Sequence, residues 1–180
     1  MKKKRYFILI VMLTVTGLET MSGCLHNQEA LTWTEVIRDI RYKYPDVKQL
    51  RTDEMHSWLT DLKSESIILI DARAREEFRV SHITGARNLP YNKDPLNPLT
   101  NIKPDRPIVV YCSVGYRSSI LARKLQDMGF TKVYNLEGSI FKWANEDRPL
   151  VQNQTTGYKV HPYNAHWGRL LERKYHVDVD

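Results

Sequence analysis

Two unbroken runs of apolar residues constrain the fold of this chain more than any other feature of its sequence. Ile67–Ile70 and Ile108–Tyr111 are each followed at once by a polar residue, Asp71 in the first case and Cys112 in the second. A short run that is apolar at every position is typical of a strand buried on both faces, as in a parallel sheet covered by helices. The two runs therefore predict the centre of an α/β sheet.

Shorter segments around these runs alternate between strand-like and helix-like patterns. Further strands are expected at Val47–Leu50, Ala86–Leu89 and Val133–Leu136. Helices are expected around Met55 and Trp58, at Arg75–Arg79, at Ser118–Met128, and in a short segment that ends near Trp143. Strands that alternate with helices form βαβ units. We therefore predict an α/β domain over residues 46–150, with a mostly parallel sheet of about five strands and helices on both faces.

The first 24 residues are expected to direct export rather than to join the fold. Met1–Arg5 is positively charged, Tyr6–Leu18 is apolar, and Ser22 and Gly23 are small residues of the kind found before a cleavage site. The apolar stretch is shorter than the roughly 17–25 residues that a transmembrane helix needs. This pattern predicts a signal peptide over residues 1–23.

Met21–Cys24 resembles a lipobox, the processing site of bacterial lipoproteins. The resemblance implies that Cys24 becomes the lipid-modified N-terminus of an envelope protein that faces the periplasm or the cell exterior. A cleaved soluble protein and an uncleaved anchor remain alternatives. Residues 24–45 would then comprise the lipidated end, a polar tether over 25–30 and a short amphipathic helix, which serves either as a spacer or as a packed cap.

Residues 151–180 form an extension after the predicted domain. A polar stretch, Gln152–Gly157, is followed by Trp167, Leu170, Leu171 and Tyr175, which would share one face of a helix. We expect this face to dock on the domain. A surface that binds a partner is the alternative.

Charge argues against a role in binding nucleic acid. The net charge is +6, but residues 1–23 carry four basic residues and one acid, which leaves only +3 for the rest of the chain. No dense patch of Lys and Arg interleaved with aromatic residues occurs there. We therefore expect no nucleic-acid partner, and we expect the protein to be a monomer.

Cysteine and histidine usage narrows the chemistry further. If Cys24 carries lipid, Cys112 is the single remaining thiol, so an internal disulfide is not expected. His161, His166 and His176 lack the accompanying Cys or carboxylate pattern of a metal site. We expect neither a metal nor an organic cofactor.

The segment from Cys112 to Ser118 joins the second apolar run to a predicted helix. Ligands bind beyond the carboxyl ends of strands in open α/β sheets. A short loop of this kind can turn its backbone N–H groups inward as an anion-binding nest, and the positive end of the helix dipole points to the same place. Gly115 gives the turn its conformational freedom, and Arg117 adds a positive charge. A thiol here is expected to have a pKa below its usual value of about 8.5.

Several ordered motifs of this chain resemble the rhodanese domain, over about 100 residues. They are Ile70–Arg73 with its Asp-x-Arg ending, Glu76–Phe78 followed by Ser81–Ala86, Val110–Cys112 with Gly115, Arg117 and Ser118, and Gly138–Ile140 with Trp143. Two positions depart from the family pattern, because Ser81 and Ser139 each replace a glycine. Both positions look structural, and neither is expected to touch the nucleophile.

The resemblance implies that Cys112 is the catalytic nucleophile of a sulfurtransferase. Ser113, Val114, Gly115, Tyr116, Arg117 and Ser118 would bind the donor and the persulfide. Asp71 would brace this loop by hydrogen bonds rather than act as a base. Arg73 would pair with Glu76 or Glu77, and binding of an incoming anion is its alternative role. His82 is expected to satisfy a backbone group.

Loop length separates two chemistries on this architecture. Four residues lie between Cys112 and Arg117. The resemblance implies that such a loop holds the single extra sulfur of a persulfide, whereas the related phosphatases and arsenate reductases use Cys-x5-Arg. A small donor such as thiosulfate would load Cys112, and a thiol or cyanide would accept the sulfur. A sulfur-carrier or sensing module without turnover, and a catalytically inactive scaffold, remain alternatives.

Overall fold

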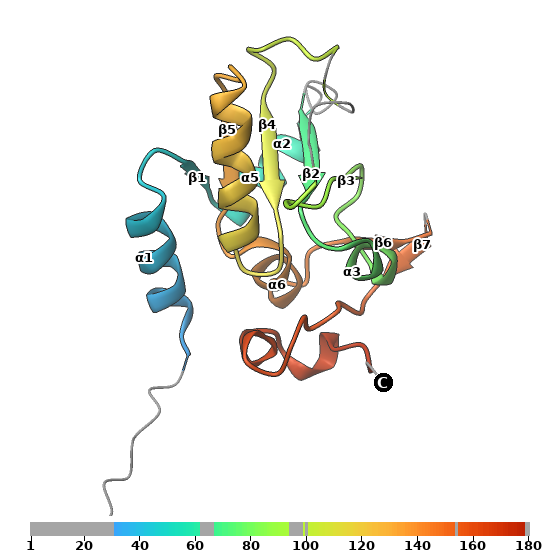
Figure 1. Cartoon of the computed structure of the whole chain (residues 1–180). Helices are drawn as coiled ribbons and strands as arrows, with labels where there is room; N and C mark the ends of the chain where they lie inside the picture. The colour runs from blue at the N-terminus through green and yellow to red at the C-terminus, as the bar shows by residue number, and fades with distance from the viewer. Residues whose placement is uncertain (1–30, 62–66, 94–98, 100, 154, 179–180) are drawn as a thin grey trace, which may run out of the picture.

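The computed structural model describes residues 31–61, 67–93, 99, 101–153 and 155–178 (Figure 1). The predicted signal peptide and Cys24 lie outside the described residues. No helix in the described part of the chain is long and apolar enough to cross a membrane.

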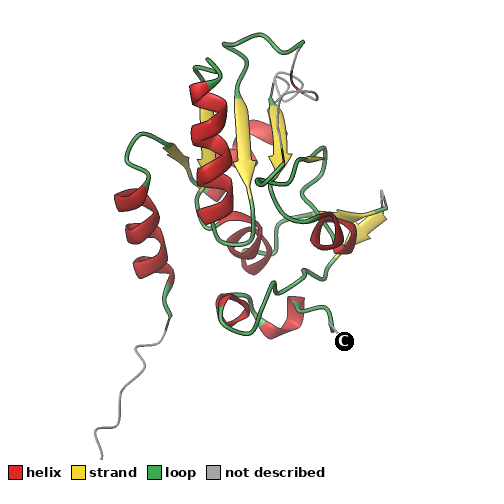
Figure 2. Ribbon diagram, in the orientation of Figure 1, coloured by secondary structure: helices red, strands yellow, loops and turns green. Residues whose placement is uncertain are grey.

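A five-stranded parallel sheet forms the centre of the molecule (Figure 2). Its strands are β1 (Lys48–Leu50), β2 (Ile68–Asp71), β3 (Arg87–Asn88), β4 (Ile108–Tyr111) and β5 (Val133–Leu136), in the spatial order β1-β5-β4-β2-β3. The helices around it are α1 (Trp33–Lys43), α2 (Thr52–Thr60), α3 (Arg75–Val80), α5 (Tyr116–Asp127) and α6 (Ser139–Asn145). The predicted α/β fold is confirmed, and every strand pairing in this sheet is parallel.

The central strands β2 and β4 bury both of their faces, as their composition predicts. They pair in register, with Ile70 opposite Val110 and Asp71 opposite Tyr111. Ile70 and Val110 pack with Leu121 and Leu125 of α5 on one face of the sheet. The residues between them in sequence, Leu69 and Val109, pack on the other face with Met55 of α2 and Ile140 of α6. Both faces are therefore covered, and the polar residues that follow the strands reach the open carboxyl edge.

Helix α5 begins two residues earlier than the sequence pattern indicates. The expected start was Ser118, but Tyr116 and Arg117 already belong to the helix. Gly115 is its N-cap, with a φ of 124° that lies in the region where only glycine is at ease. This conformation turns the chain sharply enough for the helix to start directly behind the cysteine.

Helix α1 is packed against the domain, so the spacer interpretation of this helix is wrong. Its side chains Val36 and Ile40 are buried in the larger core cluster. Thr32 and Glu35 form a capping box at its start: the backbone N–H of each residue donates a hydrogen bond to the other's side chain. Helix α1 therefore packs on the domain next to α5.

The C-terminal extension docks on the domain, as expected, but not as one regular helix. It contains a hairpin of β6 (Leu150–Gln152) and β7 (Thr155–Gly157), then two 3-10 helices, η2 (Trp167–Leu170) and η3 (Arg173–Tyr175). Leu170, Leu171 and Tyr175 are buried in the same cluster as α1 and α6. The chain after β7 passes the carboxyl edge of the central strands, beyond their arrowheads in Figure 1.

Candidate active site

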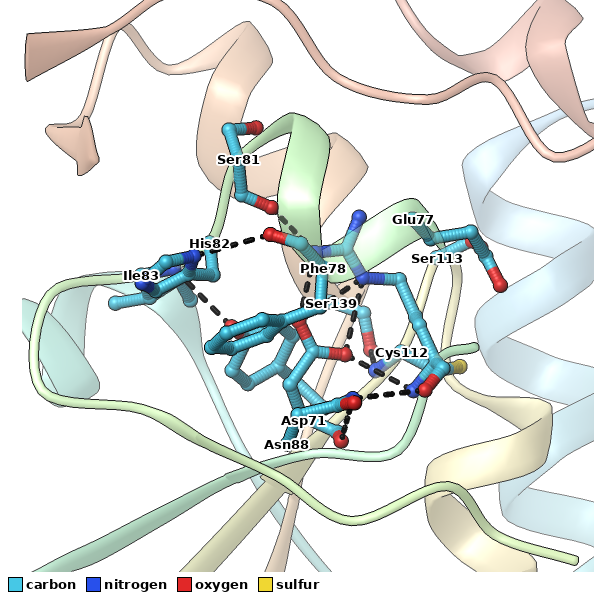
Figure 3. Close-up of polar contacts among 12 residues, drawn as sticks. Asp71, Glu77, Phe78, Ser81, His82, Ile83, Asn88, Cys112, Ser113 and Ser139 are labelled. Atoms are coloured by element: carbon cyan, nitrogen blue, oxygen red, sulfur yellow. Dashed lines mark hydrogen bonds and ion pairs between the residues drawn. The ribbon is translucent and has the colours of Figure 1, made fainter. Parts of the chain in front are cut away.

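Cys112 is the first residue after β4 and lies at the carboxyl edge of the sheet (Figure 3). The side chain of Cys112 is almost fully buried, with 1% exposure. The backbone N–H of Gly115 donates to its Sγ over 3.1 Å, and the Ser118 hydroxyl lies 3.4 Å from the same sulfur. The loop therefore supplies one N–H donor to the thiol, and the Ser118 oxygen in the first turn of α5 lies beside the same sulfur.

The start of α5 adds further donors around the thiol. The first N–H groups of an α-helix have no partner within the helix, so those of Tyr116, Arg117 and Ser118 are available to a ligand. The helix dipole places partial positive charge at the same end. The Ser118 hydroxyl is also 2.5 Å from Oδ1 of Asn135, which fixes its position beside the sulfur. The arrangement suits a negatively charged sulfur.

Arg117 is held by Glu77 rather than left free in the loop. Its Nη1 lies 2.6 Å from Oε2 of Glu77, and its Nη2 lies 2.8 Å from Oε1. Nη2 also donates to Ser113 Oγ at 2.8 Å. Burial alone would raise the pKa of Glu77, but the hydrogen bonds and charge of Arg117 lower it below its ordinary value. The positive charge that the sequence predicts for the loop is thus balanced by Glu77, and the pair braces the loop.

Asp71 and Arg73 form a separate, fully buried ion pair. Nη2 of Arg73 lies 2.6 Å from Oδ2 of Asp71 and also donates to the carbonyl of Ser81 at 2.6 Å. Burial alone would lower the pKa of Arg73, but Asp71 raises it above its ordinary value. Two expectations are therefore wrong: Arg73 does not pair with Glu76 or Glu77, and Asp71 braces Arg73 rather than the 112–118 loop.

Ser139 contacts the backbone of Cys112, contrary to expectation. The N–H of Cys112 donates to Oγ of Ser139 over 3.1 Å (Figure 3), and the Ser139 hydroxyl donates in turn to the carbonyl of Leu136 over 3.1 Å. Ser139 has a φ of 51°. The family pattern has glycine here, so this hydrogen bond is a feature of the present chain.

The other departure from the family pattern, Ser81, links the domain to its extension. Its hydroxyl donates to the carbonyl of Lys159 at 2.5 Å. In the neighbouring His82, Nδ1 lies 3.1 Å from the carbonyl oxygen of Phe78, and the imidazole stacks on the Phe78 ring. These contacts agree with the structural role expected for His82. Neither side chain faces the thiol.

A pocket of about 380 Å³ opens next to Cys112. Its lining residues are Cys112, Ser113, Val114, Tyr116 and Arg117 from the loop, together with Lys43, Tyr163 and Trp167. The last three were not anticipated from the sequence, because nothing in the local pattern places them near a loop 40 to 70 residues away. Among the described residues no cluster of side chains suits a metal ion.

The fold and the site define a class of protein: an α/β domain with a buried cysteine at a strand end, cradled by a short loop and a helix N-terminus. The family model of the rhodanese-like domain matches residues 53–146. YqhL of Bacillus subtilis is 40% identical over 79 residues, which cover 43% of this chain and 61% of that protein. A sulfurtransferase of Allochromatium vinosum is 31% identical over 105 residues, which cover 58% of this chain and 95% of that one.

Solved structures agree on the fold. A thiosulfate sulfurtransferase from Pseudomonas aeruginosa superposes with a TM-score of 0.56 at 19% identity, over 73% of this chain and 25% of that chain. The chain belongs to the rhodanese-like domain family.

Proposed function

We propose that this chain is a sulfurtransferase that carries sulfane sulfur as a persulfide on Cys112. The observation that carries the proposal is the hydrogen bond from the Gly115 N–H to a buried Sγ that lies at the N-terminus of α5. Such a setting stabilises a thiolate and the anionic terminal sulfur of a persulfide. Sulfur transfer is also the activity named for the Allochromatium vinosum relative.

Catalysis would proceed in two nucleophilic steps. The Cys112 thiolate attacks the sulfane sulfur of a donor such as thiosulfate, the donor's S–S bond breaks, and sulfite leaves with its electron pair. A thiol or cyanide then attacks the terminal sulfur and regenerates the thiolate. Gly115 and the first turn of α5 stabilise both anionic forms, while the Glu77–Arg117 pair keeps the loop in shape.

Loop size favours sulfur over phosphate as the transferred group. Arg117 follows Cys112 after four residues, and its guanidinium is engaged with Glu77 and Ser113. A phosphatase or arsenate reductase needs an arginine that turns toward a tetrahedral oxyanion. The present loop therefore supports the persulfide chemistry better.

Reduced protein treated with thiosulfate should gain the mass of one sulfur atom, and thiosulfate with cyanide should give repeated turnover with thiocyanate as product. Intact-mass spectrometry and a thiocyanate assay measure the two results. Sulfur loading without repeated turnover would show that the protein is a sulfur carrier rather than an enzyme. An unchanged mass would contradict both.

We also propose that the protein is anchored to the bacterial cell envelope through a lipid on Cys24. The support is the sequence of residues 1–24, with its charged start, apolar stretch and lipobox-like Met21–Cys24. A single acyl chain anchors only marginally, so stable attachment needs the several chains of a processed lipoprotein. Wild-type protein should fractionate with membranes, and Cys24→Ala protein should not be processed and attached in the same way. Equal membrane attachment of the variant would refute the lipid anchor and leave sulfur transfer untouched.

A further inference from the structure

The pocket beside Cys112 is closed in part by residues outside the family-matched region. Lys43 comes from the end of α1, and Tyr163 and Trp167 come from the C-terminal extension. The family match ends at residue 146. The part of the pocket that would meet the remote end of a substrate therefore includes residues outside the family-matched region, whereas the loop that meets the sulfur lies within it.

Three of the side chains that line this pocket are aromatic: Tyr116, Tyr163 and Trp167. Trp167 lies against Tyr116, with ring centroids 5.3 Å apart, and the Arg117 guanidinium lies 4.4 Å from the centre of the Tyr163 ring. Val114 adds an aliphatic side chain to the same lining. Flat apolar groups gain from contact with rings of this kind, beyond the gain from burial alone. The walls therefore favour a ligand with an organic group.

The cations at this pocket are already paired with carboxylates. Arg117 is neutralised by Glu77, and Nζ of Lys43 lies 2.9 Å from Oδ2 of Asp39. Asp39 is fixed in turn by the Tyr116 hydroxyl, which donates to it over 2.6 Å and lowers its pKa. A small inorganic anion would find little uncompensated positive charge beyond the loop itself.

Size points in the same direction. The pocket volume of about 380 Å³ is typical of sites that enclose small organic molecules. Thiosulfate, with five heavy atoms, would leave most of that volume to water.

From these features we infer that the physiological sulfur donor is an organic sulfur compound, a molecule that carries the transferable sulfur together with a flat or apolar group that packs against Tyr163 and Trp167. This inference rests on the proposed persulfide chemistry at Cys112 and adds the substrate class. An aryl thiosulfonate represents that class. The Cys112 thiolate attacks its outer sulfur, a new S–S bond forms, the bond to the sulfonyl sulfur breaks, and benzenesulfinate leaves with the electron pair. No oxidant or reductant is consumed.

The test compares benzenethiosulfonate, methanethiosulfonate and thiosulfate as donors to the full-length protein. The first two share the reacting group and differ only in the organic group. Each kcat/KM is divided by the rate of the same donor with a small free thiol, which removes differences in intrinsic reactivity. We expect the corrected phenyl-to-methyl ratio to be about tenfold in the wild type, a gain of the size that aromatic contacts give.

Trp167→Ala and Tyr163→Ala should each lower this ratio severalfold. Tyr158→Ala is the matched control, because Tyr158 lies on the same extension, is 70% exposed and does not line the pocket. Tyr163 is 45% exposed, so its variant remains informative if Trp167→Ala loosens the extension. A corrected ratio near one, or a ratio that both variants leave unchanged, would overturn the inference. Failure of all three donors to load Cys112 would instead refute the proposed function.

Discussion

Replacement of Cys112 by serine should abolish both sulfur loading and turnover while the domain stays folded. Cys112 is the only cysteine after residue 24, so no other thiol of the domain can take its place. A serine hydroxyl fits the same buried position and can still accept the Gly115 N–H. It is not ionised at neutral pH, however, and cannot form a persulfide. Intact mass after thiosulfate treatment, the thiocyanate assay and a thermal melt measure the three properties.

The matched control for this variant is Cys24→Ser, which removes the other cysteine of the chain. It should load one sulfur atom as the wild type does. Sulfur on the Cys112→Ser protein, or loss of loading in the Cys24→Ser protein, would show that the nucleophile has been misassigned.

The Arg73→Ala variant should be destabilised by about 3–5 kcal/mol, the cost of removing one member of a buried ion pair. Both side chains of the Asp71–Arg73 pair have 0% exposure, so the substitution leaves a buried carboxylate without its cation. It also removes a donor to the Ser81 carbonyl. Denaturant unfolding with a linear extrapolation measures the change in the free energy of unfolding.

Arg51→Ala is the control for a solvent-exposed ion pair. Arg51 pairs with Asp53 at 2.8 Å, but both side chains are more than half exposed, so little or no loss of stability is expected. Equal losses in the two variants would contradict the view that burial makes the Asp71–Arg73 pair important. Arg73→Ala protein that remains folded should still load sulfur, since in the described part of the chain the two side chains bond to each other and to Ser81 and not to the 112–118 loop.

The centre of the fold was predictable because its signal is local. The Ile67–Ile70 and Ile108–Tyr111 runs correspond within one residue to β2 and β4. A strand buried on both faces is apolar at nearly every position, so its sequence is hard to mistake for a surface element; the exception here is Asp71 at the end of β2, which is paired with Arg73. Cys112 and the loop after it follow from the same argument, since their position at the end of β4 is fixed once β4 is known.

The contacts that shape the site were less predictable because they join distant parts of the sequence. Glu77 and Arg117 are 40 residues apart, and Ser139 is 27 residues from Cys112. The spacing of apolar residues along the sequence does not predict that Glu77 on α3 will face Arg117 on α5. The extension was misread in form for a related reason: apolar residues spaced as on a helix also suit the two short 3-10 helices that the docked chain adopts.

Tyr116, the first residue of α5, contacts segments near both ends of the described chain. Its hydroxyl donates to Asp39 of α1, and its ring packs on Trp167 of the extension. A protein trimmed to residues 53–146 would keep every strand of the five-stranded sheet but β1, and it would lose the β6–β7 hairpin and both of these partners. Movement of α1 or of the C-terminal extension would therefore displace Tyr116, which lies next to Gly115 at the end of the Cys112 loop. The geometry of the Cys112 loop therefore depends on segments that lie on both sides of the residues that the family model matches.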